Sequence, residues 1–155
     1  MLRISKLTDY AIIILSYLAQ ETGLVASAAS IARDSHLGGA TVSKILKILA
    51  EAGLVTSLRG AGGGYQLARS ADQITVADVV SAIEGRFAMT ECCAAADLCS
   101  LDSMCGIKDN WQVINKIILT ALAGVTLQDM TGSLHQHPLT LRGIPIQVKG
   151  ATHVK

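Results

Sequence analysis

The four cysteines of the chain lie close together in the sequence. They occupy positions Cys92, Cys93, Cys99 and Cys105. In a reducing compartment, clustered cysteines more often indicate metal or redox chemistry than structural disulfides. Thiolates are soft ligands that suit iron–sulfur clusters or zinc. The sequence therefore predicts a soft metal centre or a redox site in this segment.

The spacing of the cysteines limits the kinds of metal site that they could form. Five residues separate Cys93 from Cys99, and five separate Cys99 from Cys105. Zinc fingers use closer pairs, and both ferredoxin patterns differ as well. Wide, equal spacings between cysteines in a loop suit a metal centre larger than one tetrahedral ion. Cys92 adjoins Cys93 and is expected to join the same centre only with strain, and Lys108 is no ligand, so a fourth local ligand is missing.

Three helices are expected in the first part of the chain, before the cysteine segment, with a turn between the second and the third. A first helix is expected over 8–21, capped by Thr8 and apolar on nearly all sides, which predicts deep burial. A short second helix begins at Ser27 or Ser30 and stops near His36, and glycines 38–39 form a turn. This arrangement leads into a third helix, which is expected over 40–52.

The third helix has one inward stripe and one polar face. The stripe follows the i, i+3, i+4, i+7 pattern, which is typical of a core-facing helix; it comprises Val42, Ile45, Leu46 and Leu49. Small polar and basic residues remain for the outer face: Thr41, Ser43, Lys44 and Lys47. Two short helices joined by a glycine turn, the second with such a face, form a helix-turn-helix pattern.

A glycine-tipped hairpin follows directly. Strands are expected over 54–59 and 65–68, joined by a flexible turn at 60–64. A helix-turn-helix followed by a hairpin is a winged helix. Arg59 is expected at the base of the wing and Arg69 just after its return strand, where phosphates or a minor groove would be met.

The second half of the chain contains further helices. A fourth helix is expected over 75–84, with Thr75 and Asp78 at its start. The segment 90–105 lacks periodicity and is expected to be a loop, and a long helix is expected over 107–130. Its apolar residues recur at 3-4-3-4 spacing, which predicts a coiled-coil seam and a dimer; they are Trp111, Ile114, Ile118, Ala121 and Val125.

The expected fold class is therefore mainly α with a small β-hairpin wing, extended by a long C-terminal dimerisation helix. The domain division that follows is a DNA-binding winged helix-turn-helix over 1–85, a cysteine loop over 86–106, the dimerisation helix over 107–130 and a flexible tail over 131–155.

Composition supports this interpretation and excludes other classes. The chain has 155 residues, of which 50% are hydrophobic, so a packed core is expected. Only 3% are aromatic, which argues against a base-stacking surface for single strands. The net charge of +1 is unevenly distributed along the chain. Residues 1–70 carry seven Lys/Arg and four Asp/Glu, whereas residues 71–130 carry three Lys/Arg and eight Asp/Glu. This asymmetry suggests an anion-binding front half.

Enzymes and membrane proteins are disfavoured. No CxxC motif, no Cys–His arrangement near the loop and no acid pair in a recognisable setting is present, so an oxidoreductase is not expected. The longest apolar stretches are about half of the roughly 20 residues that a membrane span needs. No signal peptide is recognisable, and a cytoplasmic location is expected.

Several segments resemble one family closely. These are Ala50 to Arg69 (AEAGLVTSLRGAGGGYQLAR), Ile74 to Gly85 (ITVADVVSAIEG) and the three-cysteine loop. Together they resemble the bacterial Rrf-type winged-helix regulators, which include the iron–sulfur regulator IscR and the nitric-oxide sensor NsrR. The opening LRISKLTDYA, the segment TVSKILK at 41–47 and the pair Asn110-Trp111 look closest to the branch that regulates the SUF cluster-assembly operon. The resemblance covers about residues 1–130.

The resemblance implies a homodimer that binds double-stranded DNA at a palindromic operator and carries a 2Fe–2S or 4Fe–4S cluster per subunit. The implied ligands are Cys93, Cys99 and Cys105, completed by Asp9 of the partner subunit. Some members have a His where Lys108 stands. His135, His137 or Cys92 remain alternatives as the fourth ligand.

The resemblance also implies where DNA is held. Family contacts fall on the third helix and the wing, here Ala40, Thr41, Ser43, Lys44 and Arg59. The reading of the residues themselves adds Lys47, Gly60 and Arg69 to the expected set. Ser43 replaces a discriminating acid of the IscR branch, so a different operator is expected. The predicted function is a repressor that senses iron–sulfur cluster status or redox and nitrosative stress and controls cluster-assembly genes. A zinc- or thiol-redox-sensing regulator of the same fold is the alternative.

Overall fold

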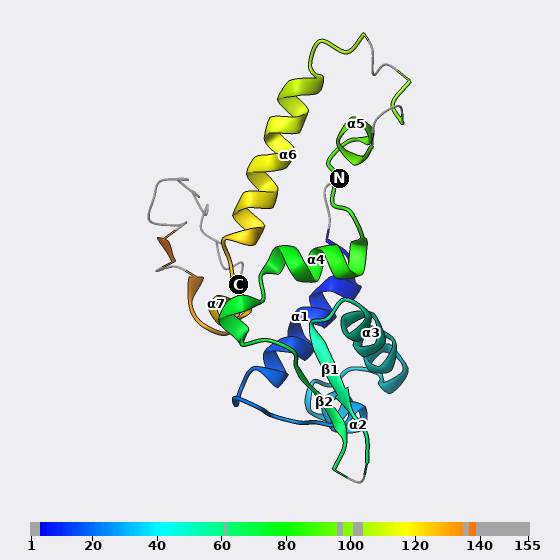
Figure 1. Cartoon of the computed structure of the whole chain (residues 1–155), viewed down its shortest axis with the longest axis vertical. Coiled ribbons are helices and arrows are strands. Elements are labelled where there is room, and N and C mark those ends of the chain that lie inside the picture. Colours follow the sequence, from blue (N-terminus) through cyan, green and yellow to red (C-terminus); the bar gives the residue numbers. More distant parts are fainter. Residues whose placement is uncertain (1–3, 61, 96–97, 101–103, 135–136, 139–155) are drawn as a thin grey trace, which may run out of the picture.

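The chain forms a helical head with a hairpin at one end and a projecting helix at the other (Figure 1). The computed structural model describes residues 4–60, 62–95, 98–100, 104–134 and 137–138. The elements, in chain order, are α1 (Lys6–Leu18), α2 (Ala28–Asp34), α3 (Gly39–Glu51), β1 (Val55–Leu58), β2 (Gly64–Leu67), the 3-10 helix η1 (Ala71–Gln73), α4 (Val76–Glu84), α5 (Glu91–Ala94), α6 (Lys108–Ala123) and α7 (Leu127–Thr131). The expected fold class, mainly α with a hairpin wing, is confirmed.

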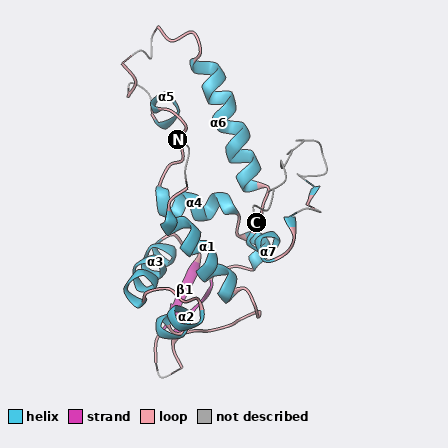
Figure 2. Cartoon of the chain, turned by 180° about the vertical axis from the view of Figure 1, so that it is seen from behind, coloured by secondary structure: helices cyan, strands magenta, loops and turns pink. Residues whose placement is uncertain are grey.

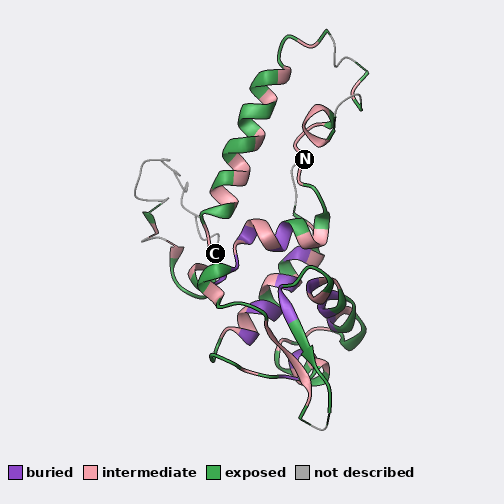
Figure 3. Cartoon of the chain, in the orientation of Figure 1, coloured by how far each residue is buried: buried purple, intermediate pink, exposed green. Residues whose placement is uncertain are grey.

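The core of the head is built from α1, α3 and α4. The four residues of the predicted stripe on α3 are all fully buried, and they pack with Ile14 and Leu15 of α1. Figure 3 shows buried residues gathered in the head and none on α6. The expected all-round burial of α1 is wrong: Ile13 is exposed, because α3, α4, β2 and α7 cover only part of the helix surface.

Helix α1 begins earlier and ends earlier than predicted. Ser5, and not Thr8, is the N-cap, and its hydroxyl accepts a hydrogen bond from the backbone N–H of Thr8. The side chain of Thr8 is buried and donates to the carboxylate of Glu84 at the end of α4. The helix ends at Leu18, three residues before the predicted end. The threonine therefore joins two helices instead of capping one.

The helix-turn-helix consists of α2 and α3, which pack against each other. Ser27 caps α2, and its hydroxyl accepts from the N–H of Ser30. The residue with positive φ between the two helices is His36, at 55°. Gly38 is instead the N-cap of α3, with extended backbone angles, and Gly39 begins the helix.

The hairpin has a defined register. Pairs run from Val55 opposite Leu67 to Leu58 opposite Gly64, so the turn comprises the residues between 58 and 64. The expected position of Arg59 at the wing base is therefore wrong: it lies at the tip. Gly60 has a φ of 109°, which favours glycine, and its carbonyl accepts from the N–H of Gly63 at 2.9 Å.

The predicted continuous helix over 107–130 is broken. Helix α6 ends at Ala123, and after Gly124 the chain is extended and forms an antiparallel bridge between Thr75 and Thr126. Thr126 and Asp129 form a capping box that starts α7, and Leu127 is buried in the head core. Figure 2 shows from behind that α7 lies against the head while α6 extends away from it.

Two further observations concern the remaining segments. The cysteine segment was expected to be a loop throughout, but Glu91–Ala94 forms one helical turn, α5, which packs beside α6. The predicted tail falls largely outside the described residues. Among the helices that the structure describes, none is long and apolar enough to cross a bilayer.

Candidate nucleic-acid interface and cysteine segment

The outer face of α3 is available to a ligand. Ala40, Ser43, Lys44 and Lys47 are exposed, and Thr41 is half-buried. The ammonium Nζ of Lys47 lies 4.0 Å from Oε1 of Glu51, one turn further along the helix. Within the described part of the chain, Lys44 makes no ion pair. Lys44 is therefore the cation on this face whose charge is least compensated.

The N-terminus of α3 is also open, which the sequence analysis missed. Gly38 supplies no side chain to cap the first N–H groups of the helix. A Cβ on Gly39 would have no neighbour within 4 Å, and one on Gly38 would meet only the hydroxyl of Thr41 at 3.8 Å. Helix N-terminal N–H groups without a cap favour anions such as phosphates. Glycine here leaves room for another molecule to approach the backbone.

The wing contributes one exposed cation at its tip and one at its base. Arg59 and Gly60 are exposed beside the turn. Arg69 follows β2, and its Nη2 lies 3.5 Å from Oδ2 of Asp78 on α4. We therefore expect Arg59 to contribute more to phosphate binding than Arg69.

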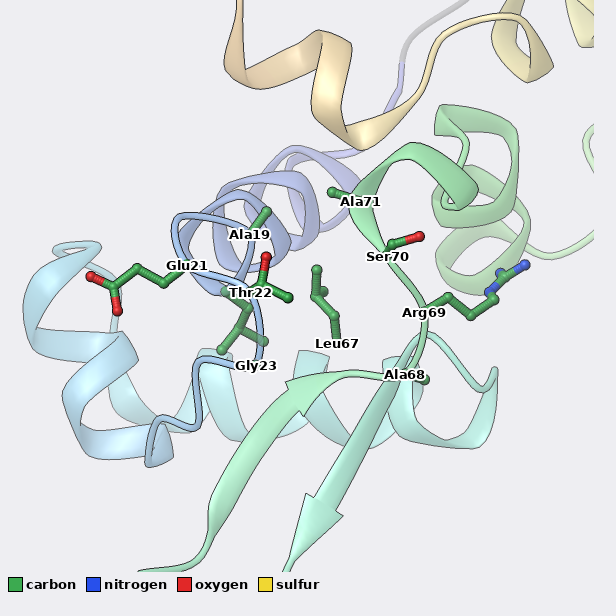
Figure 4. Close-up of a pocket in the computed structure, with 10 residues that line it drawn as sticks. Ala19, Glu21, Thr22, Gly23, Leu67, Ala68, Arg69, Ser70 and Ala71 are labelled. Carbon is green, nitrogen blue, oxygen red and sulfur yellow. The ribbon is translucent and has the colours of Figure 1, made fainter.

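A cleft of about 310 Å³ lies between the end of α1 and the end of β2. In Figure 4, Leu67 lies between the loop at Thr22 and the segment at Ala71, while Arg69 extends away toward the side. Of the predicted site residues only Arg69 lines this cleft. No set of charged groups converges in it, so it does not resemble a site for a charged ligand.

All four cysteines are free thiols and are half-buried. Cys92 and Cys93 lie on α5, and the hydroxyl of Thr90 contacts both sulfurs: 3.1 Å to Sγ of Cys92 and 3.3 Å to Sγ of Cys93. The N–H of Met89 donates to Oδ1 of Asn115 at 3.0 Å, which fastens the start of this segment to α6. The two sulfurs therefore lie near one hydroxyl, on an element tied to the projecting helix.

The donor set fits an iron–sulfur cluster in chemistry, because three thiols outside any disulfide supply soft ligands. The single chain does not assemble the set: within the described residues, no three His, Cys, Asp or Glu side chains are grouped to hold a metal ion. Asp9 is exposed in the first turn of α1 and is not part of such a group.

Of the alternative histidine ligands, the structure describes His137, which lies beside α7. Nε2 of His137 lies 3.4 Å from Oδ2 of Asp129, on α7. Hydrogen bonds from the side chain and backbone of Thr126 hold the pKa of Asp129 below its usual value. His135 lies outside the described residues.

Helix α6 presents apolar residues in a pattern that differs from the predicted seam. Trp111, Ile118 and Ala121 are half-buried on a helix that packs against α4 and α5, and Val125 is not on the helix. We define the α6 apolar stripe as the four most exposed aliphatic side chains on and before the helix: Ile107 (56% exposed), Val113 (57%), Ile114 (40%) and Ile117 (58%). Ile114 is the one member shared with the predicted seam.

Glu84 connects the cysteine segment to the start of the chain, a role that sequence reasoning did not find. Its Oε1 accepts the N–H of Ser5 at 3.1 Å and the hydroxyl of Thr8. Hydrogen bonding from the Ser5 side chain, and next from Thr8, lowers the pKa of Glu84. Because Glu84 is the last residue of α4, this contact fixes α1 against the element that leads into the cysteines.

The helix-turn-helix with an exposed second helix, together with the hairpin, defines a winged-helix DNA-binding regulator. The sequence pattern of the Rrf2 family, described as iron-dependent transcriptional regulators, matches residues 4–133. The chain belongs to the Rrf2 family. Its relatives are transcriptional regulators and not enzymes, as predicted.

Individual relatives agree with this assignment. The HTH-type transcriptional regulator NsrR of Bacillus subtilis is 31% identical over 134 residues, covering 83% of this chain and 90% of that protein. The solved structure of CymR, the global cysteine regulator of B. subtilis, is similar with a TM-score of 0.67 at 30% identity, covering 84% and 97% of the two chains. T. potens IscR gives a TM-score of 0.63 at 32% identity, covering 83% and 85%.

Proposed function

We propose that this protein is a homodimeric repressor that binds a palindromic operator in double-stranded DNA. The observation that carries the proposal is the exposed outer face of α3, with Lys44 uncompensated and an open helix N-terminus beside it. In helix-turn-helix proteins the N-terminal residues of the second helix contact base edges. Here that role falls to Ala40, Thr41 and Ser43, with Lys44 and Lys47 on phosphates.

The wing completes the proposed surface. Arg59 and Gly60 at its tip would reach the flanking backbone or minor groove, and Arg69 would add less because Asp78 already offsets its charge. Phosphate contacts release counterions, so each one adds to the salt dependence of binding. A palindromic site follows from a dimer whose two reading heads are related by twofold symmetry.

We propose that a second copy of the chain covers the α6 apolar stripe. Four aliphatic side chains exposed on and just before one helix form a surface that soluble monomers seldom leave in water. A parallel or antiparallel packing of two α6 helices would bury it, and the long helices would then set the distance between the two α3 helices. The division of the chain into 1–85, 86–106, 107–130 and 131–155 remains a prediction, amended by the break at Gly124.

We propose that Cys93, Cys99 and Cys105 hold an iron–sulfur cluster and that Asp9 of the partner subunit completes the ligand set. When bound, such a group supplies a centre whose oxidation or ligand exchange responds to oxygen, iron supply or nitric oxide. A carboxylate is harder than thiolate and leaves its iron open to exchange. The likeness to the regulators NsrR and IscR, and three free thiols on one segment, support this assignment.

The chain offers two connections through which the cysteine segment would influence DNA binding. Met89 and Asn115 join its start to α6. Glu84 joins the end of α4 to Ser5 and Thr8, next to Asp9. A shift of the segment would therefore be felt both at the dimer helix and at the first helix of the head.

The second candidate is a regulator of the same fold that senses zinc or thiol oxidation. The chain supplies four free, half-buried cysteines for such chemistry. Similarity to CymR, described as a global cysteine regulator, points the same way.

Anaerobic purification with visible spectroscopy and iron and sulfide counts separates the two candidates. A coloured protein that loses its colour when Cys93, Cys99 or Cys105 is changed to Ala supports the cluster. Asp9→Ala is expected to shift the spectrum or speed the loss of colour in air. A colourless protein whose DNA affinity follows thiol oxidation or zinc would replace the cluster proposal with the alternative.

Target genes and location complete the proposal. The resemblance to the SUF-operon branch suggests operators upstream of iron–sulfur assembly genes, and a cytoplasmic protein. DNase footprinting on those promoters tests the first point and cell fractionation the second. Protection elsewhere, with none at assembly genes, would reject the proposed regulon while leaving DNA binding intact.

A further inference from the structure

The hydroxyl of Thr90 lies between two adjacent cysteine sulfurs. Its Oγ1 is 3.1 Å from Sγ of Cys92 and 3.3 Å from Sγ of Cys93. Thr90 is the N-cap of α5, where a threonine hydroxyl would ordinarily accept a backbone N–H, yet its side chain makes no such bond. The hydroxyl is therefore directed to the sulfurs and not to the helix.

The direction of these two bonds follows from counting protons. A hydroxyl has one proton to donate and two lone pairs to accept. Thr90 donates to Cys93, so its bond with Cys92 must use the thiol proton of Cys92 as donor. The three groups form a directed chain from the Cys92 thiol through Oγ1 of Thr90 to Sγ of Cys93.

We propose that Thr90 is a positioning residue for Cys93 as a cluster ligand, and that Cys92 orients the hydroxyl of Thr90 and does not ligate. The assignment rests on the proposed cluster function. A ligating sulfur carries no proton and accepts hydrogen bonds only, which is the role that the directed chain leaves to Cys93. A donor behind a metal ligand fixes its orientation and withdraws negative charge from the sulfur.

The same count argues against Cys92 as the fourth ligand. If Cys92 also ligated, both sulfurs would be acceptors only, and the single proton of Thr90 would face two acceptors. One of the two sulfurs would then lack a hydrogen bond from Thr90. The directed chain therefore places Cys92 close to the proposed cluster site but does not make it a ligand.

The experiment uses the full-length protein, reconstituted anaerobically, and compares wild type with Thr90→Val, Thr90→Ser, Cys92→Ala and Cys92→Ser, besides the controls named below. The visible absorption is followed after exposure to air, and the midpoint reduction potential is measured. Thr90→Val keeps the shape of the side chain and removes the donor, so the absorption is expected to decay about tenfold faster, the lower end for loss of such a contact. The midpoint potential is expected to fall, because less charge is withdrawn from the sulfur.

The conservative variants test the hydrogen bond itself. Thr90→Ser and Cys92→Ser keep every donor and are expected to behave as wild type. Cys92→Ala leaves the Thr90 hydroxyl free to turn away, so an intermediate decay rate is expected. Thr56→Val, on the exposed face of the wing, is the matched control and should change neither readout.

Each other result has a defined meaning. If Thr90→Val has the decay rate and the midpoint potential of wild type, the assignment is overturned. It is also overturned if Cys92→Ser, like Cys93→Ala, fails to acquire the visible absorption of the cluster. If the metal-free Thr90→Val protein melts well below wild type, the comparison of Thr90→Ser with Thr90→Ala decides instead, and equal decay rates in that pair overturn it. A wild type that stays colourless rejects the cluster proposal itself, and with it this role for Thr90.

Discussion

Ile117→Asp is expected to dissociate the proposed dimer into monomers. Ile117 is the most exposed member of the α6 apolar stripe, with 58% of its surface accessible, so its side chain has the most to gain from a partner and contributes least within its own chain. Ile118, its neighbour, is half-buried in the single chain and would report on folding as well. A substitution at Ile117 therefore tests the proposed interface separately from the folding of the single chain.

The magnitude follows from exposure. Full burial of an isoleucine side chain contributes about 1.5–3 kcal/mol, so the 58% of Ile117 that is accessible leaves roughly 1 kcal/mol per chain to be gained in a dimer. The aspartate adds the cost of a carboxylate that loses water without a partner, at least about 1 kcal/mol per chain. Two copies change together, so the dimer loses about 4 kcal/mol, which is about a thousandfold in Kd.

Sedimentation equilibrium over a range of concentrations measures this Kd. Gln112→Asp is the matched control, because it adds the same charge to an exposed site about 140° around the helix from Ile117. We expect the control to remain dimeric and the circular dichroism of both variants to match wild type. An Ile117→Asp protein with wild-type Kd would show that the stripe is not the interface.

Three further predictions concern DNA and the head. Lys44→Ala and Arg59→Ala should each lower the slope of log affinity against log salt by about two in a dimer, measured by gel shift; slopes that do not change would remove these residues from the interface. Glu84→Gln should cost about 1 kcal/mol of unfolding free energy at neutral pH, since a charged acceptor for Ser5 and Thr8 is lost at a partly solvated site. The lowered pKa of Glu84 means that its contribution is present above the ordinary glutamate value and is lost as the pH falls through the folded value, so variant and wild type should converge in acid. Urea titrations between pH 7 and 3 measure this, and a constant difference would refute it.

Local signals were enough to predict the reading head. The four-residue stripe of α3, the serines at the start of α2 and the glycines of the hairpin turn each act within a few residues. The structure has helix, helix and hairpin in the predicted order. The cysteine identities likewise determine that soft-metal or thiol chemistry is available. These features depend on backbone preferences and side-chain chemistry that neighbours in the sequence already specify.

The errors arose where two segments far apart in the sequence compete. Apolar spacing continued past Gly124, so one long helix was expected, but the bonds of Val76 N–H to Val125 and Leu127 N–H to Ile74 draw the chain back to the head. The capping box of Thr126 was a local signal for the new helix start that the apolar pattern obscured. The tip position of Arg59 was likewise decided by strand register, which depends on pairing.

Tertiary structure alone decided which faces and sulfurs meet. Periodicity indicates that one face of α6 is apolar, but only packing against α4 and α5 determines that Ile117 stays exposed while Ile118 does not. Sequence adjacency could not show that the turn of α5 brings Cys92 and Cys93 together around the hydroxyl of Thr90. The physical reason is common to both: a residue type specifies what a side chain can bind, and the three-dimensional path of the chain specifies which groups are within reach.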